Sequence, residues 1–155
     1  MNIRPAAAAD VPQIVKLIGD IWAEYGCVLD TSVEEQYLLT PADYFHARSG
    51  EFWVMQRSDT IVATVAVMLL NEQCSELKSL YVDPNERGYG LGERLTRLAM
   101  EFAKGTGAST MVLWTDTRFT RAHRLYERLG FVRTGTRELD DINNTTEFGY
   151  RIELT

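Results

Sequence analysis

One segment constrains the fold of this chain more than any other. Residues 80–92, Leu-Tyr-Val-Asp-Pro-Asn-Glu-Arg-Gly-Tyr-Gly-Leu-Gly, place three glycines at alternate positions between a strand pattern and a helical pattern. Glycine lets the backbone approach a ligand, because no β-carbon intervenes. The start of a helix presents unpaired N–H groups at the positive end of the helix dipole. The segment therefore predicts a phosphate cradle, with Arg87 adding positive charge at its edge.

Two other phosphate-binding loops do not fit this turn. A P-loop needs Lys and then Ser or Thr after its last glycine, whereas Gly92 is followed by Glu93 and Arg94. The dinucleotide fingerprint needs a later third glycine in the first strand–helix–strand unit, and this turn lies past the midpoint of the chain. A tight turn that binds no ligand stays open as the third interpretation.

The pattern around the turn predicts an α/β fold with a mixed sheet. Apolar periodicity predicts helices over 11–22, with Asp10 as the cap, and over 41–48, 90–104 and 120–129. A further helix is expected to begin near Val33. Strands are expected over 2–4, 52–57, 61–70, 75–82, 110–115, 131–138 and 146–154. Alternation in the strand over 75–82 predicts two faces, the first with Leu77, Ser79 and Tyr81 and the second with Glu76, Lys78, Leu80 and Val82.

Length and composition limit the function classes. A chain of 155 residues predicts a single domain over 1–155. Its net charge of −6 argues against a nucleic-acid partner, which a basic surface would bind. Cys27 and Cys74 form no metal-binding pattern, which favours no metal and a cytoplasmic protein with reduced thiols. The longest apolar run covers 61–70, about half of the roughly 20 residues that span a bilayer. No signal peptide and no membrane partner are therefore expected.

Two motifs resemble one enzyme family. Arg87-Gly88-Tyr89-Gly90-Leu91-Gly92 matches the Arg/Gln-x-x-Gly-x-Gly/Ala signature of the GNAT superfamily of N-acetyltransferases. Residues 121–131 resemble the later helix of that family, with its Leu-Tyr-Glu-x-x-Gly-Phe ending. The segment 114–150 further resembles acetyltransferase domains that are sometimes fused behind a MarR-type DNA-binding domain. No winged-helix segment is visible here, so that regulatory role is not implied.

The resemblance implies a GNAT fold, with a central, mixed, mostly antiparallel twisted sheet of six to seven strands and helices on both faces. It implies transfer of the acetyl group of acetyl-CoA to a primary amine, expected to be a small molecule, by direct attack in a ternary complex. The strand before the turn splays from its neighbour in the family, so the N–H of Val82 or Leu80 is the candidate donor to the thioester oxygen. The resemblance assigns cofactor binding to Leu80, Tyr81, Val82, Arg87, Gly88, Tyr89, Gly90, Leu91, Gly92 and Phe119.

Two residues are the candidate catalysts. By resemblance Tyr126 protonates the leaving thiolate, since a phenol with a pKa near 10 stays protonated at neutral pH. Its place on an apolar helical face also fits a purely structural aromatic residue. Glu76 is the candidate general base, with a solvated residue or a partner of Lys78 as the alternative. Glu24 and Asp30 are weaker candidates for the base.

Several side chains keep two interpretations. Phe119 stands where the family often has an asparagine that contacts the cofactor. Cofactor contact is then expected from Arg121, Arg124 or Arg128, whose alternative is a solvated face paired with Glu127. His46 and His123 are expected to be structural. The substrate side is expected from Ile21 to Phe45 and from the last hairpin, with aromatic residues that serve as walls or as core, namely Trp22, Tyr25, Tyr37, Tyr44 and Phe45.

Other functions on the same fold stay open. One is a non-catalytic module that binds or senses acyl-CoA. Another is a protein N-acetyltransferase, which an open acidic groove would favour and a closed aromatic pocket would oppose. Because dimers are common in the family, a homodimer is also open.

Overall fold

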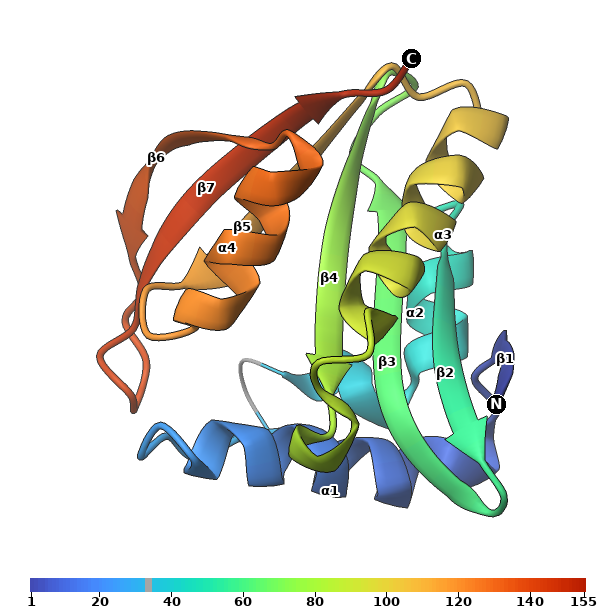
Figure 1. Ribbon diagram of the computed structural model, residues 1–155, viewed down its shortest axis with the longest axis vertical. Coiled ribbons are helices and arrows are strands. Elements are labelled where there is room, and N and C mark those ends of the chain that lie inside the picture. The colour runs from blue at the N-terminus through green and yellow to red at the C-terminus, as the bar shows by residue number, and fades with distance from the viewer. Residues whose placement is uncertain (33–34) are drawn as a thin grey trace.

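The computed structural model describes residues 1–32 and 35–155, and its centre is a seven-stranded sheet (Figure 1). The strand order is β1-β2-β3-β4-β5-β7-β6, and only β4 and β5 run parallel. The mixed, mostly antiparallel sheet is therefore confirmed. The strands are β1 Asn2–Pro5, β2 Glu51–Arg57, β3 Thr60–Leu69, β4 Cys74–Val82, β5 Thr110–Asp116, β6 Val132–Glu138 and β7 Thr146–Glu153.

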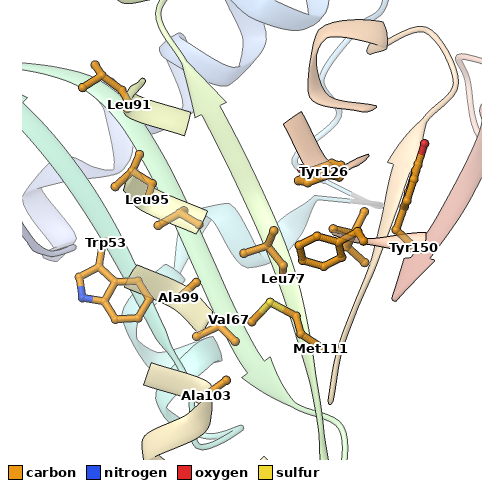
Figure 2. Close-up of a cluster of buried hydrophobic side chains, with 14 of the residues drawn as sticks. Trp53, Val67, Leu77, Leu91, Leu95, Ala99, Ala103, Met111, Tyr126 and Tyr150 are labelled. Carbon is orange, nitrogen blue, oxygen red and sulfur yellow. The ribbon is translucent and has the colours of Figure 1, made fainter. Parts of the chain in front are cut away.

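Helices cover both faces of the sheet, as expected. The α-helices are α1 Val11–Ala23, α2 Pro41–His46, α3 Leu91–Gly105 and α4 Thr120–Leu129, and short 3-10 turns span Ala8–Asp10, Gln36–Leu39 and Pro84–Glu86. One buried cluster joins α1 and α2 to the sheet through Ile14, Ile18, Phe45 and Phe52. The other joins α3 and α4 to the opposite face (Figure 2), through Leu77, Leu95, Met111 and Tyr126. The helix start expected near Val33 lies outside the described residues.

The start of α1 differs in detail from the prediction. Asp10 precedes the helix, but its carboxylate makes no capping hydrogen bond to it. It accepts two hydrogen bonds from the Arg4 guanidinium, at 2.7 and 2.9 Å, and one from the Ala7 N–H. Asp10 therefore ties β1 to the turn before the helix.

A bulge in β4 overturns the predicted alternation of that strand. Ser79 has a φ of 55°, in the left-handed region, and the pairing with β3 shifts there by one residue. The Thr64 hydroxyl donates to the Ser79 carbonyl at 2.7 Å, which secures the bulge. Since an extra residue moves the following side chains to the other face, Leu80 joins Leu77 in the α3 cluster. Tyr81 lies on the α1 face, not beside Leu77 as predicted.

The same strand also parts from its parallel neighbour. β4 pairs with β5 only over Cys74 to Glu76, and no pairing is present further along. The Asp83 N–H donates to the Val62 carbonyl of β3 at 2.8 Å. Backbone groups alternate between the two edges of an antiparallel strand, so the N–H of Val82 points to the opposite, unpaired edge. Figure 1 shows the two strands diverging toward the end of β4.

Candidate active site

A cavity of about 410 Å³ opens where β4 ends, between the glycine turn, the start of α3 and one side of α4. Every predicted cofactor-binding residue except Tyr89 lines this first cavity. The Tyr89 side chain points to solvent, with 76% of its surface exposed. The fold thus gathers residues 80–92 and Phe119 around one space.

The three glycines of the turn serve two purposes. Gly88 and Gly90 have φ values of 89° and 77°, which residues other than glycine rarely adopt. The space beside both is open, and among residues 1–32 and 35–155 no side chain caps the helix at Gly90, so the first amides of α3 are free to bind an anion. Gly92 is different, because a β-carbon there would lie 3.1 Å from the Leu125 side chain of α4. Gly92 therefore allows the two helices to approach.

Arg87 was predicted to add positive charge at the edge of the glycine turn, but it already forms an ion pair within the protein. Its guanidinium donates to both carboxylate oxygens of Glu24, at 2.9 and 3.2 Å. Glu24 directly follows α1, so the pair joins that helix to the glycine turn. The same contact occupies Glu24, one of the weaker candidates for the base.

Three arginines of α4 bring positive charge to the first cavity. Arg121, Arg124 and Arg128 are exposed and line its outer side. Their predicted alternative partner, Glu127, instead accepts from the Tyr150 hydroxyl at 2.6 Å and lies 3.5 Å from Arg133. The solvated face that the alternative predicted is therefore present, but the pairing with Glu127 is wrong.

A second cavity, of about 140 Å³, adjoins the first on the other side of β4 and α4. Both spaces are bordered by Leu80, Tyr81, Phe119 and Ala122. The Phe119 ring packs 4.9 Å from Tyr25 and 6.3 Å from Tyr81, measured between ring centroids. Phe119 thus forms an apolar wall between the cavities, at the position where the family often has an asparagine.

Tyr126 lines the second cavity and also belongs to the core. Its ring packs 5.9 Å from Tyr150 (Figure 2). It also packs 5.6 Å from Phe131. Within the described part of the chain its hydroxyl makes no hydrogen bond. Burial raises the pKa of the Tyr126 phenol far above its ordinary value, with a further contribution from Tyr150. The phenol is therefore protonated at neutral pH and free to donate.

Glu76 lies in the wall of the same cavity, on β4. Its side chain is only 12% exposed, and the Lys78 ammonium lies 3.8 Å from one of its oxygens. Lys78 also sits 5.2 Å from the centre of the Tyr37 ring. The structure thus brings both candidate catalysts, Glu76 and Tyr126, to the second cavity. It also places Lys78 beside Glu76, as the alternative of a Glu76–Lys78 pair predicted.

The expected aromatic residues divide between walls and core. Trp22 and Tyr37 line the second cavity, and Tyr25 lines the first. Phe45 is fully buried in the α1 cluster. The Arg48 guanidinium stacks 3.6 Å from the centre of the Tyr44 ring, away from both cavities.

Sequence reasoning missed the contribution of β5 to the second cavity. Trp114 lines it, with the Arg137 guanidinium 4.3 Å from its ring centre, and Asp116 and Glu147 lie in the same wall. A tryptophan within a strand pattern, Trp114, was the available signal. The expected contribution of the last hairpin is present, through Arg137 and Glu147.

The histidines and cysteines lie outside both cavities. His123 is buried, its Nε2–H donates to the Asp116 carbonyl at 2.9 Å, and burial lowers its pKa. His46 pairs with Glu51 at 2.9 Å on the surface. Burial raises the pKa of the Cys27 thiol, and Cys74 begins β4. Over residues 1–32 and 35–155 no group of three or more metal-binding side chains occurs, and no helix is long and apolar enough to cross a membrane.

Comparison with known proteins places this arrangement in context. The model of the Acetyltransferase (GNAT) family matches residues 15–131. N-acetyltransferase 8F1 of Rattus norvegicus is 31% identical over 128 residues, which are 79% of this chain and 56% of the relative. N-acetylaspartate synthetase of Danio rerio is 34% identical over 113 residues, which are 72% of this chain and 39% of the relative. The chain thus spans about half the length of these curated relatives, or less.

Solved structures share the fold. An acetyltransferase of the GNAT family from Staphylococcus aureus Mu50 superposes with a TM-score of 0.87, at 21% identity and with 99% of each chain covered. A putative acetyltransferase from Salmonella typhimurium, solved with its cofactor acetyl-CoA, superposes with a TM-score of 0.78, at 18% identity, over 100% of this chain and 94% of that one.

Proposed function

Since the chain belongs to the GNAT acetyltransferase family, we propose that it transfers the acetyl group of acetyl-CoA to the primary amine of a small molecule. One observation carries the proposal. Two cavities meet at the unpaired edge of β4. The first contains the glycine turn and the free start of α3, and the second contains a protonated phenol and a carboxylate. Such an arrangement can hold a donor and an acceptor together, so attack is direct and occurs in a ternary complex.

The first cavity suits the donor. Gly88 and Gly90 leave open space beside their backbone, and the uncapped start of α3 offers N–H groups to the diphosphate. The unpaired edge of β4 offers further backbone groups to the amide-bearing arm of coenzyme A. The N–H of Val82 or Leu80 is a fixed donor to the acetyl oxygen, where negative charge develops as the amine attacks.

The second cavity supplies the proton transfers. Glu76 accepts a proton from the amine, directly or through water, because only a neutral amine can attack. The C–N bond forms and the C–S bond breaks, and the Tyr126 hydroxyl gives its proton to the departing sulfur. Neither cysteine lies in the cavities, which supports transfer without an acyl-enzyme.

The size and charge of the second cavity support a small, cationic or neutral acceptor. Its volume is about 140 Å³, and Trp22, Tyr37 and Trp114 enclose it, in the manner expected of a small-molecule enzyme. Among the described residues, Lys78 and Arg137 are the cations of the wall, and Arg118 binds Asp116 at 3.0 Å from outside it. The wall also holds six carboxylates, from Asp30, Glu35, Glu76, Asp116, Asp141 and Glu147. This excess of negative charge disfavours an acceptor that carries its own carboxylate.

The test is coenzyme A release from acetyl-CoA across a panel of amines, with product masses checked. A trio of 1,4-diaminobutane, butylamine and 4-aminobutanoate keeps a four-carbon chain and places a positive, a neutral or a negative group at its far end. Release above the blank without amine, strongest for the diamine, supports the proposal. No release with any amine, while acetyl-CoA still raises the melting temperature, favours the acyl-CoA-sensing alternative. Release only with peptides favours a protein substrate.

A further inference from the structure

One wall of the second cavity is built from three segments that are far apart in the chain. Val28 follows α1, Asp116 ends β5, and Asn143 and Thr145 belong to the turn between β6 and β7. The Asn143 amide joins the first segment to the third, because it accepts from the Val28 N–H at 2.9 Å and donates to the Val28 carbonyl at 2.8 Å. The shape of this wall therefore depends on side-chain contacts and not on sheet pairing.

Arg118 holds the three segments together from outside the cavity. It is not among the residues that line either cavity. Its guanidinium donates to the Asp116 carboxylate at 3.0 Å, to the Asn143 carbonyl at 3.1 Å and to the Cys27 sulfur at 2.8 Å. It also contacts the Thr145 hydroxyl at 3.4 Å. We call these five residues the Arg118 network.

The geometry of this network requires a guanidinium group. Arginine presents its N–H groups in a rigid planar fork, whereas lysine carries one charged nitrogen on a flexible stem. Here Nε, Nη1 and Nη2 each donate to a different segment. The side chain of Arg118 is 33% exposed and that of Asp116 is 11% exposed, so water competes little for these hydrogen bonds. One side chain thus fixes three segments at once.

We propose that Arg118 is a positioning residue for the acceptor amine. It holds Asp116 and Asn143 in place, and through Asn143 the segment after α1, without touching the amine itself. The inference rests on the proposed function, because it takes the second cavity as the acceptor site. Loss of the fork loosens this wall and weakens the binding of the amine. The candidate catalysts Tyr126 and Glu76 keep their places, since they lie on α4 and β4, outside the Arg118 network.

Arg118→Lys tests this role without changing the charge beside the acidic wall. Steady-state kinetics use 1,4-diaminobutane, or the panel amine that wild type acetylates fastest. The KM for the amine should rise about tenfold or more, as the loss of charge-assisted hydrogen bonds predicts, and kcat should stay within about threefold of wild type. Calorimetry should find the Kd for acetyl-CoA within about twofold of wild type, because no residue of the Arg118 network lines the first cavity.

Arg4→Lys is the matched control. Arg4 donates two hydrogen bonds to the Asp10 carboxylate, and the two side chains are 31% and 9% exposed, close to the values for Arg118 and Asp116. Neither member of this pair lines a cavity. Both lysine variants should lower the melting temperature, but Arg4→Lys should leave the KM for the amine unchanged. A purely structural role for Arg118 would not produce that difference.

Asn143→Ala tests the same network from its other end. It removes the two hydrogen bonds to Val28 and should also raise the KM for the amine. Since both substitutions release the same wall, the double variant Arg118→Lys/Asn143→Ala should raise the KM by less than the product of the two single effects.

The inference is overturned if Arg118→Lys leaves the KM for the amine unchanged, or if Arg4→Lys raises it equally. It is also overturned if the effects in the double variant multiply, because the two residues would then act independently. The proposed function survives each of these results, since wild type still acetylates the amine. If wild type releases coenzyme A with no amine of the panel, the proposed function fails and the inference fails with it.

Discussion

At the scale of single residues, Tyr126 combines a structural role with a candidate chemical one. Its ring is part of the α3 cluster, and its hydroxyl belongs to the wall of the second cavity. Both interpretations taken from the sequence therefore describe the same side chain. Removing only the oxygen separates them, because the ring and its packing remain.

Tyr126→Phe should lower kcat about 100-fold or more, the usual contribution of a general acid. The Kd for acetyl-CoA and the melting temperature should stay close to wild type, because the hydroxyl has no hydrogen bond to lose within the described residues. Steady-state kinetics, calorimetry and thermal unfolding measure the three quantities. An unchanged kcat would exclude Tyr126 as the acid.

Tyr150→Phe is the matched control for that variant. Tyr150 lies 5.9 Å from Tyr126, but its hydroxyl donates to Glu127 at 2.6 Å and accepts from Arg133 at 2.9 Å. Its loss should reduce the free energy of unfolding by about 1 kcal/mol or more, and kcat should not change. A loss of kcat in Tyr126→Phe and a loss of stability in Tyr150→Phe would distinguish the chemical tyrosine from the structural one.

At the scale of elements, the junction of β4 and α3 determines how a phosphate can be bound. Gly90→Ala should destabilise the protein by about 1 kcal/mol, because alanine disfavours a left-handed backbone. It should also weaken acetyl-CoA binding by displacing the first amides of α3. Gly105→Ala, at the far end of the same helix, has open space and no positive φ. Calorimetry should find wild-type binding for this control and a raised Kd for Gly90→Ala.

The bulge in β4 is the second element on which the site depends. Ser79→Val should destabilise the protein by about 1–3 kcal/mol, because a β-branched residue resists the left-handed φ that the bulge requires. Ser79→Gly loses the same hydroxyl, and its 3.2 Å contact with Tyr37, but accepts that backbone. Chemical denaturation and turnover should therefore show a severe defect for Ser79→Val and a mild one for Ser79→Gly. Equal defects would mean that the hydroxyl, not the bulge, is what matters.

At the scale of the whole molecule, one buried histidine links stability to pH. Burial lowers the pKa of His123 in the folded state, whereas the unfolded chain has the ordinary value near 6.5. Below that pH the unfolded chain takes up a proton that the folded protein refuses. The free energy of unfolding should therefore fall as the pH drops from about 7 to 5.5.

Denaturation at several pH values measures this slope. His123→Gln should flatten the slope between about pH 7 and 5.5, even if the loss of packing against Phe148 lowers stability at every pH. An identical slope in the variant would exclude His123 as the titrating group. The homodimer stays a prediction at this scale, and sedimentation velocity would test it.

Much of the architecture could be predicted, because the signals are local. The helix over 120–129 and its glycine cap were predicted at the observed residues, since periodicity and capping depend on near neighbours in the chain. The glycine turn pointed to the phosphate side of the site for the same reason. The resemblance then supplied Tyr126 and Glu76, which the fold brings to one cavity.

The sequence alone therefore determined the order of the elements and the glycine turn that suits a phosphate, both of which depend on interactions between near neighbours. The mixed sheet could be predicted from that order, although its strands pair residues far apart in the chain. Only the tertiary structure decided that Glu24 engages Arg87, and that the Arg124 face of α4 borders the first cavity. It also decided which face of β4 each side chain takes after the bulge at Ser79. These features join residues far apart in the chain, and packing sets such contacts without leaving a local pattern.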